Sequence, residues 1–257
     1  MISNTSTNNQ TCAYASLSHP GRVQQRNQDR WFADRFQGLF IVSDGISGTL
    51  AGELAATIIV ETLPRLLRKR LRDIKTLKAP EAWERLRLAL VELSDRLFQE
   101  TKDQPGLDGM GATVVLVLVW DFQALIGHLG DSRAYLWRKG HLEQLTKDHS
   151  FIQLLLDYGK ITPDEVTTHQ AQGRLTRYVG MIGEALPETQ FLELQAGDRL
   201  LLCSDGLNRM LPDGDILAIL NQKLPLKESC EHLIATANAN GGKDNITALI
   251  LSIYRQQ

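Results

Sequence analysis

Residues 40–45 (FIVSDG) and residues 201–206 (LLCSDG) share one plan, in which a short apolar run ends in Ser-Asp-Gly. An apolar run of this length that stops at a turn dipeptide is typical of a buried strand. Each run therefore predicts a core strand with a carboxylate, Asp44 or Asp205, at its end. The repetition favours a shared role for the two aspartates over two unrelated turns.

Three further aspartates have related contexts. Asp131 follows the run IGHLG, Asp244 precedes a β-rich run, and Asp29 comes directly before Arg-Trp-Phe. Carboxylates crowded at one edge of a sheet repel one another unless cations neutralise them. Mg²⁺ and Mn²⁺ are hard ions that prefer oxygen ligands, so they suit such a group.

Each aspartate taken alone also fits an ordinary turn. Asp-Gly is a common turn dipeptide, and residues 213–214, which follow Leu-Pro with no strand before them, and residues 108–109 are predicted to be ordinary turns. On the residues alone, the metal group and the ordinary turns stay about equally favoured.

The remaining sequence predicts helices and strands in separate groups. Apolar residues recur at helical spacing from residue 50 and again from residue 83, with a basic connection at 69–80. Capping sequences at Ser150 and Thr162 predict two short helices. Further helices are expected at 216–220 and 230–237, further strands at 199–203 and 246–253, and an antiparallel meander of short strands at 113–120, 124–129, 134–137 and 142–145. This order favours an α+β fold with a sheet-on-sheet core covered by helices.

Composition limits the class of protein. The chain has 257 residues and a formal net charge of -2, so no broad cationic field favours nucleic acid as a partner. Its longest apolar run is far below the ~20 residues of a membrane span, so no membrane partner is expected. Three widely spaced cysteines favour a reducing, cytoplasmic location. We expect a disordered N-terminal lead at 1–11 and one domain at 12–257.

Eight short motifs occur in a fixed order along the chain. They are NQD at 27–29, VSDGISG at 42–48 with Gly-Glu at 52–53, GAT at 111–113, GDSRAY at 130–135, TKDHS at 146–150, LTR at 175–177, LCSDGL at 202–207 and GKDNIT at 242–247. In this order they resemble the bacterial branch of the metal-dependent protein phosphatases, the protein phosphatase 2C family. The resemblance extends from about Ser18 to the C-terminus.

The resemblance implies a fold and a set of metal ligands. The fold would be two stacked antiparallel sheets flanked by pairs of helices, with a mobile flap at about 150–173 beside the active site. Two to three Mn²⁺ or Mg²⁺ ions would be bound. The implied roles are a metal-bridging carboxylate for Asp44, a carbonyl ligand for Gly45, further ligands for Asp205 and Asp244, a third-metal ligand shared with Asp205 for Asp131, and a hydrogen bond to metal-bound water for Asp29.

The implied activity is hydrolysis of phosphoserine and phosphothreonine in proteins. A metal-bridging hydroxide would attack phosphorus in line with the leaving oxygen, without a covalent enzyme intermediate. The expected partners are a phosphorylated protein substrate and a Ser/Thr kinase whose action the enzyme reverses in signal transduction.

The sequence departs from the family pattern at two positions. Gln24 stands where the family has a phosphate-binding arginine, which leaves Arg22, Arg26 and Gln24 as the candidate substrate-binding residues. Ser47 replaces a glycine beside the metal ligands. His128 and His149 are predicted to be structural rather than catalytic.

These departures motivate a second hypothesis, a degenerate phosphatase fold that acts as a regulatory or binding module with weak or no turnover. A third hypothesis, a two-metal nuclease or small-phosphoester hydrolase, shares the chemistry but lacks a basic, aromatic surface pattern. The retained aspartates favour the active protein phosphatase.

Overall fold

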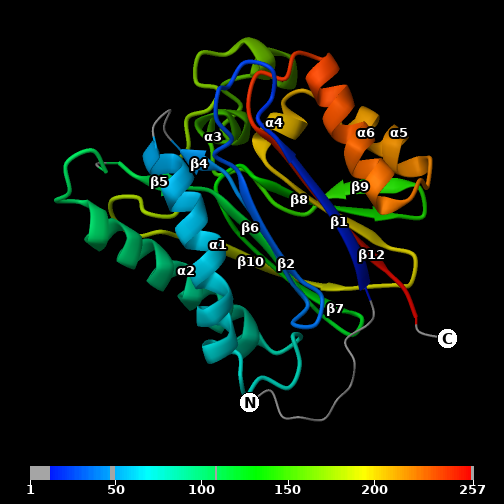
Figure 1. Ribbon diagram of the computed structural model, residues 1–257, viewed down its shortest axis with the longest axis horizontal. Helices are drawn as coiled ribbons and strands as arrows, with labels where there is room; N and C mark the ends of the chain where they lie inside the picture. Colours follow the sequence, from blue (N-terminus) through cyan, green and yellow to red (C-terminus); the bar gives the residue numbers. More distant parts are fainter. Residues whose placement is uncertain (1–11, 47–49, 108, 256–257) are drawn as a thin grey trace.

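Two five-stranded antiparallel sheets stack face to face in the computed structural model, which describes residues 12–46, 50–107 and 109–255 (Figure 1). The first sheet has the order β10 (Glu188–Glu193), β7 (Gln123–Leu129), β6 (Val114–Trp120), β3 (Leu39–Ser43) and β2 (Arg30–Asp34). The second has the order β1 (Cys12–His19), β12 (Ile246–Ile253), β11 (Arg199–Cys203), β8 (Arg133–Arg138) and β9 (His141–Gln144). The predicted lead at 1–11, Ser47 and Asp108 lie outside the described residues.

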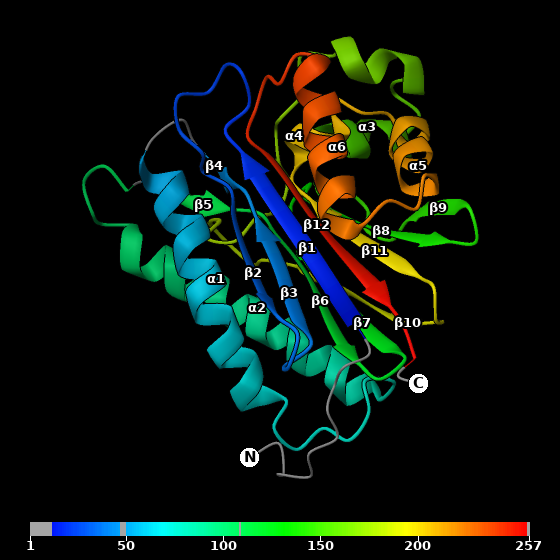
Figure 2. The ribbon, with the colours of Figure 1, turned by 45° about the vertical axis from the view of Figure 1, so that its right-hand side comes forward.

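Helices cover the outer face of each sheet, which confirms the predicted α+β sandwich (Figure 2). The first sheet is covered by α1 (Leu50–Arg70) and α2 (Pro80–Thr101), and the second by α4 (Asp205–Asn208), α5 (Asp213–Asn221) and α6 (Leu226–Ala239). Between β9 and β10 lie α3 (Phe151–Asp157) and the 3₁₀ helix η1 (Pro163–Thr168). Among the described residues, no helix combines the length and apolar character needed to cross a bilayer.

The core has three apolar layers because the strands between them are apolar on both faces. In β3, Phe40 and Val42 enter the layer between the sheets, whereas Leu39 and Ile41 pack beneath α1 and α2. The run at 114–119 divides in the same way, as its lack of alternation predicts. Each fully buried aliphatic side chain contributes about 1.5–3 kcal/mol to folding, so these layers fix the strand ends firmly.

Two expectations were wrong. The predicted meander is divided between the sheets: β6 and β7 pair in the first, and β8 and β9 pair in the second. The chain changes sheets at residues 130–132, where Gly130 has a φ of 111°, and strand periodicity does not report which sheet a strand joins. Residues 213–214 lie in the first turn of α5 rather than in an isolated Pro-Asp-Gly turn, since the acidic residues Asp213 and Asp215 favour a helix N-terminus.

The fold brings five aspartates to one end of the sandwich: Asp29, Asp44, Asp131, Asp205 and Asp244. Strands β3, β7 and β11 end there, immediately before Asp44, before Gly130-Asp131 and before Ser204-Asp205. Strands β2 and β12 run antiparallel to their neighbours and begin there, just after Asp29 and after Asp244-Asn245. A small two-stranded sheet of β4 (Gly45–Ile46) and β5 (Gly111–Ala112) lies at the same end.

Candidate metal centre

Asp44 is held at the end of β3 by Thr113. The Thr113 backbone N–H donates to the Asp44 carbonyl oxygen at 2.8 Å, and the Asp44 N–H donates to Thr113 Oγ1 at 3.1 Å. The Ser43 hydroxyl also donates to the Thr113 carbonyl oxygen at 2.7 Å. These bonds fix the backbone on both sides of the Asp44 carboxylate, a role for Thr113 that sequence analysis missed although the residue lies in the GAT motif.

Asp205 and Asp244 lie next to each other because Gly206 permits close backbone contact. A Cβ atom on Gly206 would lie 2.0 Å from the Asn245 carbonyl oxygen, so any other residue would push the two segments apart. The Asn245 N–H donates to Asp244 Oδ1 at 2.9 Å, and its side-chain amide donates to the Arg26 carbonyl oxygen at 2.8 Å. Asn245 therefore links the end of β11 and the start of β12 to the loop that precedes β2.

Asp29 is buried between the sheets, with one carboxylate oxygen hydrogen-bonded and the other without a hydrogen-bond partner. Ser204 Oγ and Thr247 Oγ1 each donate to Asp29 Oδ2 at 2.7 Å, whereas Oδ1 is buried without a hydrogen-bond partner. Burial raises the pKa of Asp29 to about 7; the negative charges of Asp205 and Asp244 act in the same direction, and the two hydroxyl donors oppose it. Ser204 and Thr247 are further positioning residues, and each lies within one of the listed motifs.

Asp131 is buried at the end of β7 and is paired with a cation. Arg209, in the turn after α4, places Nη2 3.1 Å from Asp131 Oδ2 and 2.5 Å from Asp205 Oδ2. Burial raises the pKa of Asp131 to about 8, and the Asp205 charge raises it while Arg209 lowers it. Sequence analysis did not identify Arg209.

Asp29, Asp44, Asp131, Asp205 and Asp244 form one electrostatic group, which we name the carboxylate cluster. Burial raises the pKa of Asp44 well above its usual value, and the charges of the other four aspartates raise it further. Burial likewise raises the pKa of Asp205, with Asp244 adding to the effect and Arg209 opposing it. Five distant segments of the chain thus converge, so the cluster is not a set of separate solvent-exposed turns.

The cluster fits divalent metal ions. Besides Asp29 Oδ1, Asp205 Oδ1 is buried and has no hydrogen-bond partner. Buried carboxylate oxygens without donors are costly unless a cation neutralises them. Several carboxylates around one centre match the oxygen ligands that Mn²⁺ and Mg²⁺ prefer. Gly45 follows Asp44 directly in β4, where a Cβ would lie 2.4 Å from the Gly52 carbonyl oxygen.

The candidate phosphate-binding residues lie beside the cluster rather than within it. Arg22, Gln24 and Arg26 have exposed side chains in the loop between β1 and β2. Gln24 is the nearest of the three by its contacts, since its Nε2 donates to Asp244 Oδ1 at 3.4 Å. The Arg22 N–H donates to the Gly242 carbonyl oxygen at 2.7 Å, which fixes the loop next to Asp244.

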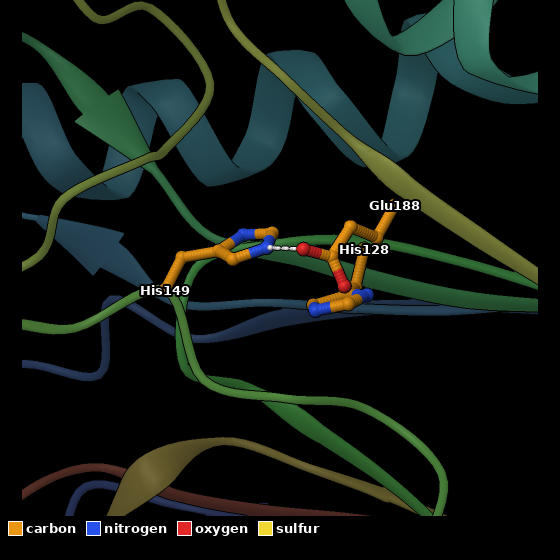
Figure 3. A group of neighbouring side chains, drawn as sticks. All are labelled: His128, His149 and Glu188. Atoms are coloured by element: carbon orange, nitrogen blue, oxygen red, sulfur yellow. Dashed lines mark ion pairs between the residues drawn. The ribbon is translucent and has the colours of Figure 1, made fainter. Parts of the chain in front are cut away.

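A second polar group lies on the other side of Gly130. His128, His149 and Glu188, which we name the histidine group, place one side-chain N or O atom each within 4.8 Å of one another (Figure 3). The two rings are stacked, with centroids 4.5 Å apart and planes 13° apart. Their nitrogen lone pairs therefore do not converge on one point, which disfavours a metal ion.

Hydrogen bonds already occupy the histidine group. His149 Nδ1 accepts from the Gly130 N–H at 3.2 Å, and His128 Nε2 donates to the Lys147 carbonyl oxygen at 2.9 Å. Arg177 donates to Glu188 Oε1 at 3.1 Å. Burial lowers the pKa of His149 to about 4, with repulsion from His128 acting in the same direction. His149 is thus tied to the turn that carries Asp131, in keeping with its predicted structural role.

Comparisons with known proteins agree with this geometry. The family model described as protein phosphatase 2C matches residues 18–250. The serine/threonine phosphatase stp of Listeria monocytogenes is 35% identical over 234 residues, which cover 90% of this chain and 92% of that protein. Protein phosphatase PhpP of Streptococcus pneumoniae is 32% identical, covering 93% of this chain and 97% of that protein.

Solved structures give the same result. The serine/threonine phosphatase PstP/Ppp of Mycobacterium tuberculosis superposes with a TM-score of 0.81 at 33% identity, covering 95% of this chain and 99% of that one. A structure of the catalytic domain of PstP in complex with two manganese ions has a TM-score of 0.79 at 32% identity, with 95% and 99% covered. The chain belongs to the protein phosphatase 2C family of metal-dependent serine/threonine protein phosphatases.

Proposed function

We propose that the carboxylate cluster binds two divalent ions, Mn²⁺ or Mg²⁺, and that the chain uses them to hydrolyse phosphoserine and phosphothreonine in proteins. The convergence of five buried or half-buried aspartates, two of which have unpartnered oxygens, is the observation on which this proposal rests. The two manganese ions in the PstP structure support it. Asp44, Asp205, Asp244 and the Gly45 carbonyl are the proposed ligands.

The chain's own residues position the reactants. When bound, the ions supply Lewis acidity toward water and the phosphoryl oxygens. Asp29 is held through Oδ2 by Ser204 and Thr247, which leaves Oδ1 to accept a hydrogen bond from water. The exposed loop with Arg22, Gln24 and Arg26 receives the phosphorylated segment; Gln24 offers an amide donor next to Asp244.

A thiol nucleophile has no part in this chemistry. All three cysteines are buried and free. Burial raises the pKa of Cys203 to about 12, so its thiol stays protonated near neutral pH. Attack by water is the route that remains.

We further propose that residues 150–173 act as a flap over the cluster. An isolated bridge between Ser150 and Leu175 joins the two ends of this segment, and the Phe151 N–H donates to the Arg174 carbonyl oxygen at 2.8 Å. Between these ends α3 is mostly half-buried, whereas residues 157–160 and 162–165 are exposed. The segment can therefore move as a unit about a narrow base.

The physiological substrate is proposed to be a protein phosphorylated by a Ser/Thr kinase in the cytoplasm, so that the enzyme reverses that kinase in a signalling pathway. The relatives named as serine/threonine phosphatases support the substrate class. Three free, buried cysteines suit a reducing compartment.

Activity assays separate the hypotheses. We expect hydrolysis of an aryl phosphate and of phosphoserine and phosphothreonine peptides with Mn²⁺ or Mg²⁺, and loss of turnover with a chelator. Turnover no greater than that of Asp205→Ala would favour the binding-module hypothesis. Preference for nucleotides over phosphopeptides would favour the small-phosphoester hydrolase.

A further inference from the structure

Arg209 bridges two carboxylates with a single nitrogen. Its Nη2 lies 2.5 Å from Asp205 Oδ2 and 3.1 Å from Asp131 Oδ2. Both carboxylate side chains are about nine-tenths buried, at 8% and 10% exposure, whereas the arginine side chain is 29% exposed. The guanidinium thus occupies the position between the two aspartates where a shared metal ion would contact both.

The local fold holds Arg209 in this position. Arg209 follows Asp205 by four residues, and its N–H donates to the Asp205 carbonyl oxygen at 2.9 Å, so one helical turn sets the spacing. On its other side lies Gly173, at the end of the proposed flap. A Cβ on Gly173 would be only 3.6 Å from Arg209 Nη1 and 3.7 Å from Nη2. The guanidinium therefore lies between the two carboxylates and Gly173, with part of its surface exposed.

The charge of Arg209 acts on one side of the cluster. It partly neutralises the carboxylates of Asp131 and Asp205, the two that its Nη2 contacts. Asp205 keeps a second oxygen, Oδ1, that is buried and unpartnered. Asp205 can thus bind Arg209 through Oδ2 and a metal ion through Oδ1.

We propose that Arg209 is a built-in cation that closes the space between Asp131 and Asp205 to a divalent ion, so that this chain binds two ions and not three. The resemblance to the family assigned a third ion to these two aspartates, and Arg209 replaces it. This inference rests on the proposed function, because it assumes that the other aspartates bind two ions. A divalent ion and a guanidinium cannot share this position, since like charges at contact distance repel strongly.

Counting bound Mn²⁺ tests the inference independently of activity. Equilibrium dialysis with metal analysis is expected to give two ions for the wild type and three for Arg209→Gln. Arg209→Lys, which keeps a cation, is expected to stay at two. Arg138→Gln is the matched control: Arg138 pairs with the buried Asp198 at 2.7 Å, is 28% exposed, and lies outside the cluster. It is expected to bind two ions.

Three ions on the wild type, or two on a folded Arg209→Gln, would overturn the inference and leave the proposed function intact. No bound Mn²⁺ on the wild type would instead overturn the proposed function. If Arg209→Gln does not fold, as judged by circular dichroism, Asp131→Asn gives a second test. We expect it to retain two ions, because Asp131 contacts Arg209 rather than metal; loss of an ion would contradict the proposal.

Discussion

The carboxylate cluster and the histidine group lie on opposite sides of the Gly130 turn, and both gather side chains that commonly bind metals. Their charges are balanced in opposite ways. Burial raises the pKa of Asp29, Asp44, Asp131 and Asp205 in the cluster. In the histidine group burial lowers the pKa of both rings, and Arg177 neutralises Glu188.

The difference shows that ligand-type residues alone do not define a metal site. Arg177 supplies a cation next to the histidine group, and the hydrogen bonds of the group are largely complete. The carboxylate cluster has an excess of negative charge and two buried oxygens without partners. An ion is required only where the protein leaves charge uncompensated.

The largest expected effect is at Asp44. Asp44→Asn removes the carboxylate whose pKa depends on all four others, so we expect kcat/KM with Mn²⁺ to fall by about 10³-fold or more. We expect Mn²⁺ to raise the thermal midpoint of the wild type by binding the folded state, and not to raise that of Asp44→Asn. Steady-state kinetics checks the first point, and scanning calorimetry with and without Mn²⁺ checks the second. A variant that keeps its Mn²⁺-dependent shift would show that Asp44 is not a ligand.

Gly206→Ala should have the next largest effect. The new Cβ would meet the Asn245 carbonyl oxygen at 2.0 Å and separate Asp205 from Asp244. We expect roughly a hundredfold loss of activity and destabilisation by about 2 kcal/mol or more, measured by urea unfolding. Gly214→Ala in α5 is the matched control, since its Cβ meets nothing within 4 Å and should stabilise the helix slightly. Equal activity and equal unfolding free energy of the two variants would contradict the claim that Gly206 is needed for the close contact with Asn245.

How far the sequence predicted this arrangement depends on whether a feature is local in the sequence or joins residues that are far apart in it. The strand ends at Asp44 and Asp205 were predictable because a buried run followed by Ser-Asp-Gly is a local pattern. The pairing of Arg209 with Asp131 was not, because the two residues are 78 positions apart and only the fold brings them together. The division of the meander between two sheets was not predictable either. Strands of both sheets are similarly apolar, so the sequence of a strand does not show which sheet it joins.

The histidine group should respond to acid. An unfolded His149 takes up its proton near pH 6.5, whereas the folded one does so near 4, so the stability it contributes is present above pH 6.5 and is lost as the pH falls toward 4. Between pH 7 and pH 5 the free energy of unfolding should fall by about 1–2 kcal/mol more in the wild type than in His149→Gln. Denaturant titrations in chelator check this, with the exposed His141→Gln as control. Parallel pH profiles for wild type and His149→Gln would contradict the shifted pKa.

The smallest effect is expected at Glu188. Its side chain is 49% exposed and pairs with Arg177, so Glu188→Gln should change stability by less than about 1 kcal/mol. Because the stacked rings disfavour a metal ion in the histidine group, we expect the number of bound Mn²⁺ not to change. Metal analysis of the purified variant checks this. Loss of an ion would show that the histidine group binds a metal, in contradiction to the contrast drawn between the two groups.

The pairing of β1 with β12 bears on synthesis at the ribosome. Strand β12 lies between β1 and β11, and Asp244 comes just before it. A nascent chain that has not yet released residues 244–253 lacks both a proposed ligand and the strand that joins its first segment to the second sheet. Catalysis is therefore expected to begin only after residues 244–253 have left the ribosome and β12 has inserted between β1 and β11.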